Sequence, residues 1–186
     1  VAMITYTQDN FQKIFALSDP AFEGLKIYHN LLIKWQKTIN LVSNKTLDEA
    51  WHRHFADSAQ LARFIPHEEG SYIYADLGCG GGFPGLVLAM MRPDLETHLV
   101  ESDERKCQFM RTVIREAGVT NATVHTERIE NVTGEFIPHF VSARALASLR
   151  KLLDYCQPWM KANSYLRFYF LKGERAMQEL EEARRS

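Results

Sequence analysis

The sequence has three cysteines, no long apolar run and almost no net charge, and each shortage excludes a class of protein. Cys79, Cys107 and Cys156 form neither an even set nor a metal-ligand spacing, so we expect free thiols and predict no metal site. No apolar stretch reaches membrane-spanning length and no signal-peptide pattern is visible, so we expect a cytoplasmic protein without membrane contact. A formal net charge of -1 excludes a globally basic surface, so any nucleic acid must meet local patches.

Glycine is also scarce, yet half of the ten glycines fall within residues 78–85. The apolar residues 72–75 precede this cluster and predict a short buried strand. Pro84 and the apolar residues 86–91 follow it and predict a helix. A strand, a glycine-rich turn and a helix in succession indicate a nucleotide-binding βα corner, because only glycine allows so sharp a turn and so close an approach.

Two cofactor classes compete for this corner. Gly80, Gly82 and Gly85 satisfy the dinucleotide fingerprint, with Glu101 at the distance of a ribose-binding acid. Asp76-x-Gly78-x-Gly80 fits better, because the acid ends the strand and resembles the first motif of class I methyltransferases that use S-adenosylmethionine. Glu101 suits a ribose in both interpretations, whereas Asp76 offers a carboxylate to the ammonium group that only S-adenosylmethionine carries.

The rest of the chain predicts one α/β unit, and the resemblance of the Asp76 motif implies that its fold is the Rossmann-like fold of class I methyltransferases. Residues 1–66 are predicted to form an N-terminal helical extension packed on the core, and residues 67–186 the cofactor-binding core. Strands alternate with helices in the core, so we expect a mostly parallel twisted sheet with helices on both faces. The expected strands are residues 72–75, 97–101, 122–125, 136–142 and 165–171.

Polar or charged residues follow four of these strands. In parallel sheets ligands bind at the carboxyl ends of the strands, near the point where the strand order reverses. We therefore expect one crevice that collects Asp76, Glu101, Ile129, Glu130 and Arg144.

The N-terminal helices carry three further patterns. Thr46 begins a capping-box sequence that predicts a third helix running to Pro66. His54 and Asp57 are one helical turn apart, and we interpret them as a surface pair rather than a proton relay. Lys34 and Lys37 belong to a basic stripe that is either a solvated face or a contact for RNA.

A family resemblance follows from motifs spread over nearly the whole chain. The chain resembles the bacterial small-subunit ribosomal RNA methyltransferase G family, also called glucose-inhibited division protein B. The motifs, in order, are Asn40-Leu41-Val42-Ser43, Arg53-His54-x-x-Asp57-Ser58, Asp76 to Gly85, Arg128-Ile129-Glu130, Ser142-Ala143-Arg144-Ala145 and Leu171-Lys172-Gly173.

This resemblance implies methyl transfer from S-adenosylmethionine to N7 of a guanine in 16S ribosomal RNA, in a loop near the decoding site. The substrate would be the RNA itself or a small-subunit particle, and we expect the enzyme to be a monomer. Family members continue beyond Lys172-Gly173 into a closing pair of strands, whereas this sequence ends at Ser186. The sequence therefore does not decide how this edge of the sheet is completed. The cofactor contacts carried over by motif are Gly78, Phe83, Ile129, Glu130 and Arg144, and Lys172 is a candidate phosphate contact.

The sequence leaves the catalytic residues unassigned. Guanine N7 carries a lone pair and no proton, so its attack on a sulfonium methyl requires alignment and no general base. Two other functions remain as alternatives: a nicotinamide-dependent oxidoreductase, which would leave Asp76 and Arg144 without a role, and a non-catalytic RNA-binding module.

Overall fold

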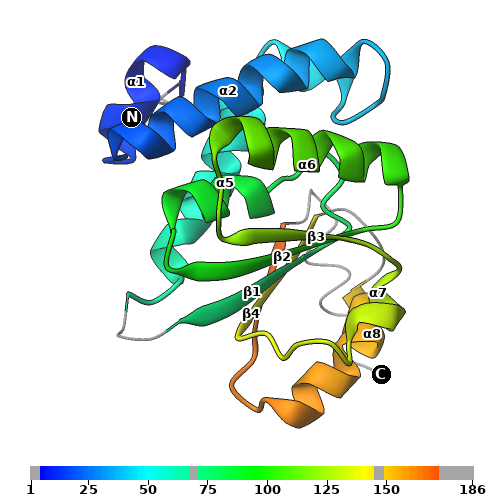
Figure 1. Cartoon of the computed structure of the whole chain (residues 1–186). Helices are drawn as coiled ribbons and strands as arrows, with labels where there is room; N and C mark the ends of the chain where they lie inside the picture. Colours follow the sequence, from blue (N-terminus) through cyan, green and yellow to red (C-terminus); the bar gives the residue numbers. More distant parts are fainter. Residues whose placement is uncertain (1–4, 68–70, 145–148, 172–186) are drawn as a thin grey trace.

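A five-stranded parallel sheet forms the centre of the molecule in the computed structural model, which describes residues 5–67, 71–144 and 149–171 (Figure 1). The strand order is β3-β2-β1-β4-β5. The order reverses between β1 and β4, so the crevice expected for a ligand lies at the carboxyl ends of these two strands. The strands are β1 (Tyr72–Leu77), β2 (Leu95–Glu101), β3 (Ala122–Thr126), β4 (Phe140–Arg144) and β5 (Arg167–Leu171).

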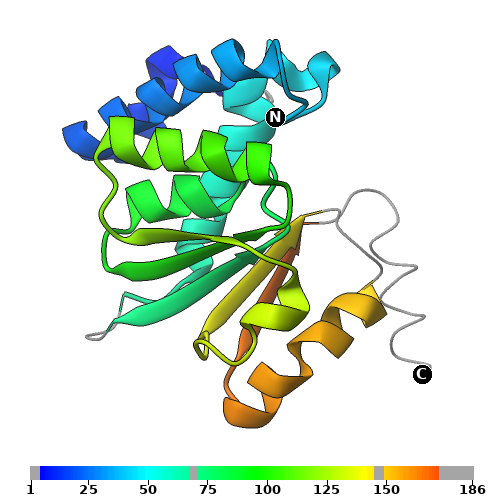
Figure 2. The same cartoon turned by 45° about the vertical axis from the view of Figure 1, so that its right-hand side comes forward.

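Helices cover both faces of this sheet, as Figures 1 and 2 show. On one face, α5 (Gly85–Met91) and α6 (Glu104–Ala117) bury Val87, Phe109 and Met110. On the other face, α7 (Ile129–Val132) and α8 (Leu149–Ala162) pack against alternate residues of β1, β2 and β4. The predicted α/β fold with a parallel sheet between helical layers is therefore confirmed.

The N-terminal helices lie over α5 and α6 and share their core. Phe11, Tyr28 and Phe55 are fully buried in the same hydrophobic cluster as Phe109 of α6. Pro20 stands in the first turn of α2, where its missing N–H costs nothing, and the apolar face of that helix packs against α6. The elements are α1 (Gln8–Ile14), α2 (Asp19–Gln36), α3 (Asn44–Leu47), the π-helix η1 (Trp51–Ala56), α4 (Asp57–Ala59) and the 3₁₀ helix η2 (Gln60–Phe64).

Two predictions of secondary structure are wrong. The third N-terminal helix does not begin at a capping box on Thr46, because α3 starts after Ser43 and Thr46 lies inside it. The Thr46 hydroxyl instead donates to the carbonyl oxygen of Ser43 at 2.9 Å. The fourth strand begins at Phe140 and not at Phe136, because Pro138 cannot donate to a ladder and Phe136 stacks on His98.

Candidate cofactor and methyl-transfer site

The glycine-rich loop after β1 is held from three sides. Gly78 donates its N–H to the carbonyl of Val100 in β2 at 2.7 Å. Tyr28 of α2 donates its hydroxyl to the carbonyl of Gly81 at 2.5 Å, and Gly80 donates its N–H to Glu101 Oε2 at 2.9 Å. The loop is therefore fixed before any ligand arrives, and its backbone forms the wall of a crevice.

Asp76 supports this loop from behind. Its side chain has no exposed surface, Oδ2 accepts from the Gly85 N–H at 2.7 Å, and Oδ1 accepts from the Ser142 hydroxyl at 2.8 Å. Burial raises the pKa of Asp76 to about 7, while the bonds from Ser142 and Gly85 and the charge of Arg144 act in the opposite direction. The expected contact between Asp76 and a cofactor ammonium does not fit this geometry, because both oxygens face the protein interior. Asp76 instead ties β1 to β4 and to the start of α5.

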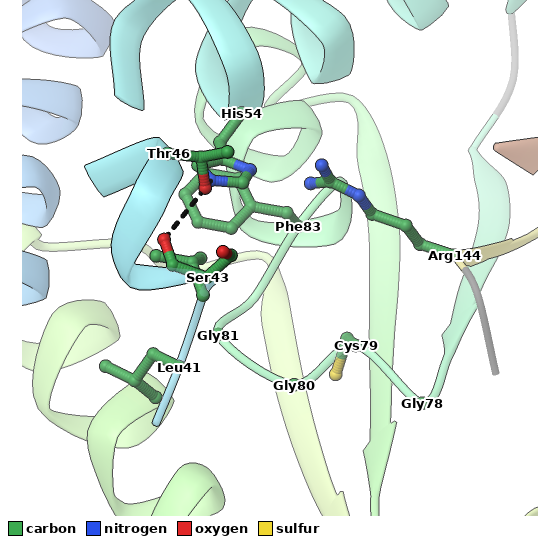
Figure 3. A pocket seen from close by; sticks show the side chains of 11 residues that line it. Leu41, Ser43, Thr46, His54, Gly78, Cys79, Gly80, Gly81, Phe83 and Arg144 are labelled. Atoms are coloured by element: carbon green, nitrogen blue, oxygen red, sulfur yellow. Dashed lines mark hydrogen bonds between the residues drawn. The ribbon is translucent and has the colours of Figure 1, made fainter. Parts of the chain in front are cut away.

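A first cavity of about 320 Å³ opens in front of the loop (Figure 3). Phe83 forms part of its wall and stacks on Tyr28 with ring centroids 5.0 Å apart. Arg144 reaches into it from the end of β4, and its guanidinium donates to the carbonyl of Arg53 at 3.4 Å, which is a weak bond. The lining residues are Leu41, Val42, Ser43, Thr46, His54, Gly78, Cys79, Gly80, Gly81, Phe83 and Arg144.

A second cavity of about 310 Å³ lies on the other side of Gly78. Glu101 lines it at the end of β2, where Oε1 accepts from the Asp103 N–H at 3.0 Å. Each carboxylate oxygen has a further lone pair, so Glu101 can still accept from a ligand hydroxyl. The lining residues are Gly78, Val100, Glu101, Ser102, Glu127, Arg128, Ile129, Glu130, Lys151 and Tyr155.

Gly78 lines both cavities, so they adjoin along the carboxyl ends of β1, β2 and β4, and we call the two together the crevice. Six of the seven cofactor-binding residues predicted from the sequence line it, and Asp76 is the exception. The six are Gly78, Phe83 and Arg144 in the first cavity, and Gly78 again with Glu101, Ile129 and Glu130 in the second.

The three lysines predicted to meet RNA lie apart from the crevice lining or beyond the described residues. Lys34 and Lys37 are exposed at the C-terminal end of α2, on the side of the molecule where β1 and β2 end (Figure 1). Lys172 lies outside the described residues. The basic stripe is thus confirmed as a surface feature, and its contact with RNA stays a prediction.

Sequence reasoning missed the outer wall of the first cavity. This wall comes from the N-terminal helices and includes Ser43, Thr46 and His54. The family motifs contain Ser43 and His54 but assigned them no role in the site. The predicted pair between His54 and Asp57 is also wrong, because His54 Nε2 lies 2.8 Å from Thr46 Oγ1 instead. The helix is π-helical at this point, so residues three apart no longer meet as in an α-helix.

Two absences apply to the described ranges. No helix in them has both the length and the apolar composition to cross a membrane. Within the same ranges, histidine, cysteine, aspartate and glutamate side chains form no group of three or more that could hold a metal ion.

Solved structures with a similar arrangement of elements include two methyltransferases. A SAM-dependent O-methyltransferase from Thermotoga maritima superimposes with a TM-score of 0.56 and 16% identity, covering 83% of this chain and 52% of that one. A precorrin-6y C5,15-methyltransferase from Geobacter metallireducens gives a TM-score of 0.54 and 13% identity, covering 77% and 74%. At these identities the likeness establishes the fold alone.

Sequence comparison identifies the family. The family model for rRNA small subunit methyltransferase G matches residues 21–186. A ribosomal RNA small subunit methyltransferase G from Parvibaculum lavamentivorans is 47% identical over 182 residues, covering 96% of this chain and 78% of that protein. One from Rhodospirillum centenum is 45% identical over 183 residues, covering 98% and 81%. The oxidoreductase and RNA-binding alternatives gain no support from these matches, and the chain belongs to the rRNA small subunit methyltransferase G family.

Proposed function

We propose that this protein transfers the methyl group of S-adenosylmethionine to N7 of a guanine in 16S ribosomal RNA. The observation that carries the proposal is the single crevice at the carboxyl ends of β1, β2 and β4. Its two cavities adjoin at Gly78, which lines both of them. Family membership supports the same activity.

The second cavity fits the adenosine part of the cofactor. Glu101 presents a carboxylate to the two ribose hydroxyls, and its bonds to Gly80 and Asp103 hold it in place. Ile129 supplies an apolar surface for the base, and Glu130 lies beside it. We assign Glu101, Ile129 and Glu130 to this half.

The first cavity fits the amino-acid end of the cofactor and the target base. Arg144 offers a guanidinium that can hold a carboxylate as a fork. Phe83 and the backbone of Gly78 complete the wall, and Asp76 holds the far end of the loop at Gly85. Asp76 therefore contributes to cofactor binding indirectly, by holding the glycine-rich loop in position.

When bound, S-adenosylmethionine supplies an electrophilic methyl group on a positively charged sulfur. Guanine N7 attacks with its own lone pair, so this chain has to align the base and exclude water, which can lower a barrier by roughly 7–11 kcal/mol. His54 is the one titratable imidazole that lines the first cavity, and burial lowers its pKa to about 4. A group with this pKa is a poor base, which agrees with a reaction that needs none.

The activity is tested with labelled S-adenosylmethionine and ribosomal RNA that lacks the modification. Naked 16S RNA and the small-subunit particle serve as separate substrates, and chemical cleavage at 7-methylguanosine locates the product. We expect label at N7 of one guanine. That guanine should lie in a loop, because the deep major groove of an RNA duplex hides N7. Label on an exocyclic amine or a pyrimidine would refute the N7 assignment, and no label on either substrate would refute the proposed function.

The RNA surface is tested at the exposed end of α2. Reversing Lys34 and Lys37 to Glu should weaken RNA binding and flatten its salt dependence, because fewer phosphate counterions are released. The double variant Lys13→Glu, Lys161→Glu makes the same change in net charge on α1 and α8, away from the crevice, and serves as the control. Equal RNA affinity in the two double variants would show that Lys34 and Lys37 form a solvated face without RNA contact.

A further inference from the structure

His54 carries a buried nitrogen without a partner in the wall of the first cavity. The side chain is 5% exposed, and it stands on η1 where the N-terminal helices meet the glycine loop. Nε2 lies 2.8 Å from Thr46 Oγ1, whereas Nδ1 has no hydrogen-bond partner among the described residues. A buried polar atom of this kind costs stability, so its retention calls for an explanation.

The contacts of Thr46 determine which nitrogen of His54 carries the proton. A threonine hydroxyl has one proton, and Thr46 donates it to the carbonyl oxygen of Ser43 at 2.9 Å. While that bond is in place, Nε2–H is the donor to Thr46 Oγ1, and this is the tautomer that we adopt for His54. Burial, with smaller contributions from the charges of Arg144 and Arg53, lowers the pKa of His54 to about 4, so the ring is neutral at pH 7. Nδ1 then carries a lone pair and acts as an acceptor.

This acceptor lies beside the group that suits a carboxylate. Figure 3 shows Thr46 on one side of the His54 ring, while the guanidinium of Arg144 extends toward its other side. The guanidinium is held among the described residues only by the weak 3.4 Å bond to Arg53, so it can turn toward a ligand. An α-amino acid carries a carboxylate and an ammonium on one carbon. A guanidinium and a neutral imidazole acceptor side by side match these two groups.

Asp76 cannot serve as the acceptor for the ammonium. Its carboxylate is fully buried, and Asp76 is not among the residues that line either cavity. Glu101 lines only the second cavity, on the far side of Gly78 from Arg144. Among the described side chains that line the first cavity, His54 has the buried polar atom without a hydrogen-bond partner.

We propose that His54 Nδ1 accepts a hydrogen bond from the ammonium group of S-adenosylmethionine, while Arg144 binds the carboxylate on the same carbon. The assignment rests on the proposed function, because it needs the amino-acid end of this cofactor in the first cavity. His54 is then a cofactor-binding residue that sets the position of the methyl group through the methionine chain.

Two substitutions separate the two nitrogens of His54. The amide nitrogen of His54→Gln reaches the position of Nε2 and can still donate to Thr46, but this variant lacks an acceptor at Nδ1. His54→Asn places its amide oxygen where Nδ1 stands and lacks the donor to Thr46. Binding is measured by calorimetry with S-adenosylhomocysteine, which has the amino-acid end, and with methylthioadenosine, which lacks it.

We expect His54→Gln to bind S-adenosylhomocysteine about 10- to 100-fold more weakly, the range for a lost hydrogen bond to a charged group. Methylthioadenosine should bind it as it binds the unsubstituted protein. His54→Asn should keep most of its affinity for S-adenosylhomocysteine. Equal losses for both ligands would overturn the proposal, since the side chain would then only shape the cavity. Unchanged affinity for S-adenosylhomocysteine with slower RNA methylation would also overturn it, and would assign His54 to the target base.

A measurement on the unsubstituted protein keeps the proposal testable if the variants fold poorly. An analogue of S-adenosylhomocysteine with hydrogen in place of the ammonium should bind about 10- to 100-fold more weakly. Equal binding of this analogue and of S-adenosylhomocysteine would refute the role of His54, while the proposed function would stand. If the unsubstituted protein binds none of these ligands, the proposed function is refuted, and this inference falls with it.

Discussion

Gly85 is the residue at which a single methyl group should do the most damage to the site. A Cβ on Gly85 would stand well inside van der Waals contact with Leu99 Cδ2, 2.7 Å from Asp76 Oδ2 and 2.9 Å from Asp76 Cβ. Leu99 and Asp76 belong to the paired central strands β2 and β1, and both are fully buried, so neither can move away cheaply. We therefore expect Gly85→Ala to push the start of α5 away from the sheet.

Two contributions set the size of the effect. Overpacking a well-packed core costs about 1–3 kcal/mol. The same displacement stretches the bond from the Gly85 N–H to the Asp76 carboxylate, and hydrogen bonds to charged groups contribute about 1.5–3 kcal/mol. The contributions are not independent, because the movement that relieves the clash also breaks the bond. A total of about 3–5 kcal/mol is a large part of the 5–15 kcal/mol typical of a folded domain.

The assay is urea unfolding with a matched glycine as the control. Gly134 stands in an exposed turn where an added Cβ would meet nothing within 4 Å, so Gly134→Ala should change the free energy of unfolding by less than about 1 kcal/mol. Gly85→Ala should also bind S-adenosylhomocysteine more weakly, because the loop that it displaces separates the two cavities. If the two variants were equally stable, the close approach of Gly85 to Asp76 would be refuted.

Two further substitutions test other supports of the glycine loop. Glu101→Ala should weaken the binding of S-adenosylhomocysteine by about 1.5–3 kcal/mol, or about 10- to 150-fold, because a carboxylate bonded to ribose hydroxyls is lost; calorimetry with an unchanged affinity would remove Glu101 from the site. Tyr28→Phe should lower the free energy of unfolding by about 1–3 kcal/mol, because it leaves the buried carbonyl of Gly81 without its 2.5 Å bond. Thermal unfolding with no shift would show that this carbonyl is satisfied in another way.

The part of the site that the sequence predicts is the part built from local chemistry. Gly78 and the glycines after it can only form a sharp βα turn, and a charged residue after a buried strand is expected at its carboxyl end. Glu101 and Arg144 could thus be placed in one crevice, because the carboxyl ends of parallel strands share an edge. The fold class follows from the same alternation of strands and helices.

The part that could not be predicted depends on packing between distant segments. Asp76 lies inside β1, which ends at Leu77, and does not follow the strand as the sequence predicted. Inside a strand its side chain points to one face of the sheet, and here that is the face that α5 covers. His54 reaches the crevice only because a π-helical turn brings the ring against Thr46 and Phe83. Neither feature has a periodic signal in the sequence, since Asp76 is held by β4 and the start of α5, and His54 by the N-terminal helices.

Stability against pH gives a last prediction, in which two buried groups act in opposite directions. Burial, with Arg144 and Arg53 nearby, lowers the pKa of His54 to about 4, below the value of about 6.5 in an unfolded chain. The unfolded state therefore takes up a proton first, and the stability that His54 contributes above pH 6.5 is lost as the pH falls toward 4. Burial raises the pKa of Asp76 to about 7 from about 3.9 unfolded. Here the folded state keeps the proton, so its contribution is present at low pH and is lost as the pH rises through 7.

The two effects partly cancel between pH 5 and 7, so unfolding of the unsubstituted protein alone cannot separate them. Variants that lack the titrating group at position 54 or 76 can separate them. On going from pH 7 to 5, the unsubstituted protein should lose about 1–2 kcal/mol in free energy of unfolding relative to His54→Gln. Over the same range the unsubstituted protein should gain about 2 kcal/mol of stability relative to Asp76→Asn. Urea unfolding at pH 5, 6 and 7 measures both. Parallel curves for His54→Gln would mean that His54 titrates alike in the folded and unfolded states, and a neutral buried acceptor at Nδ1 would then be refuted.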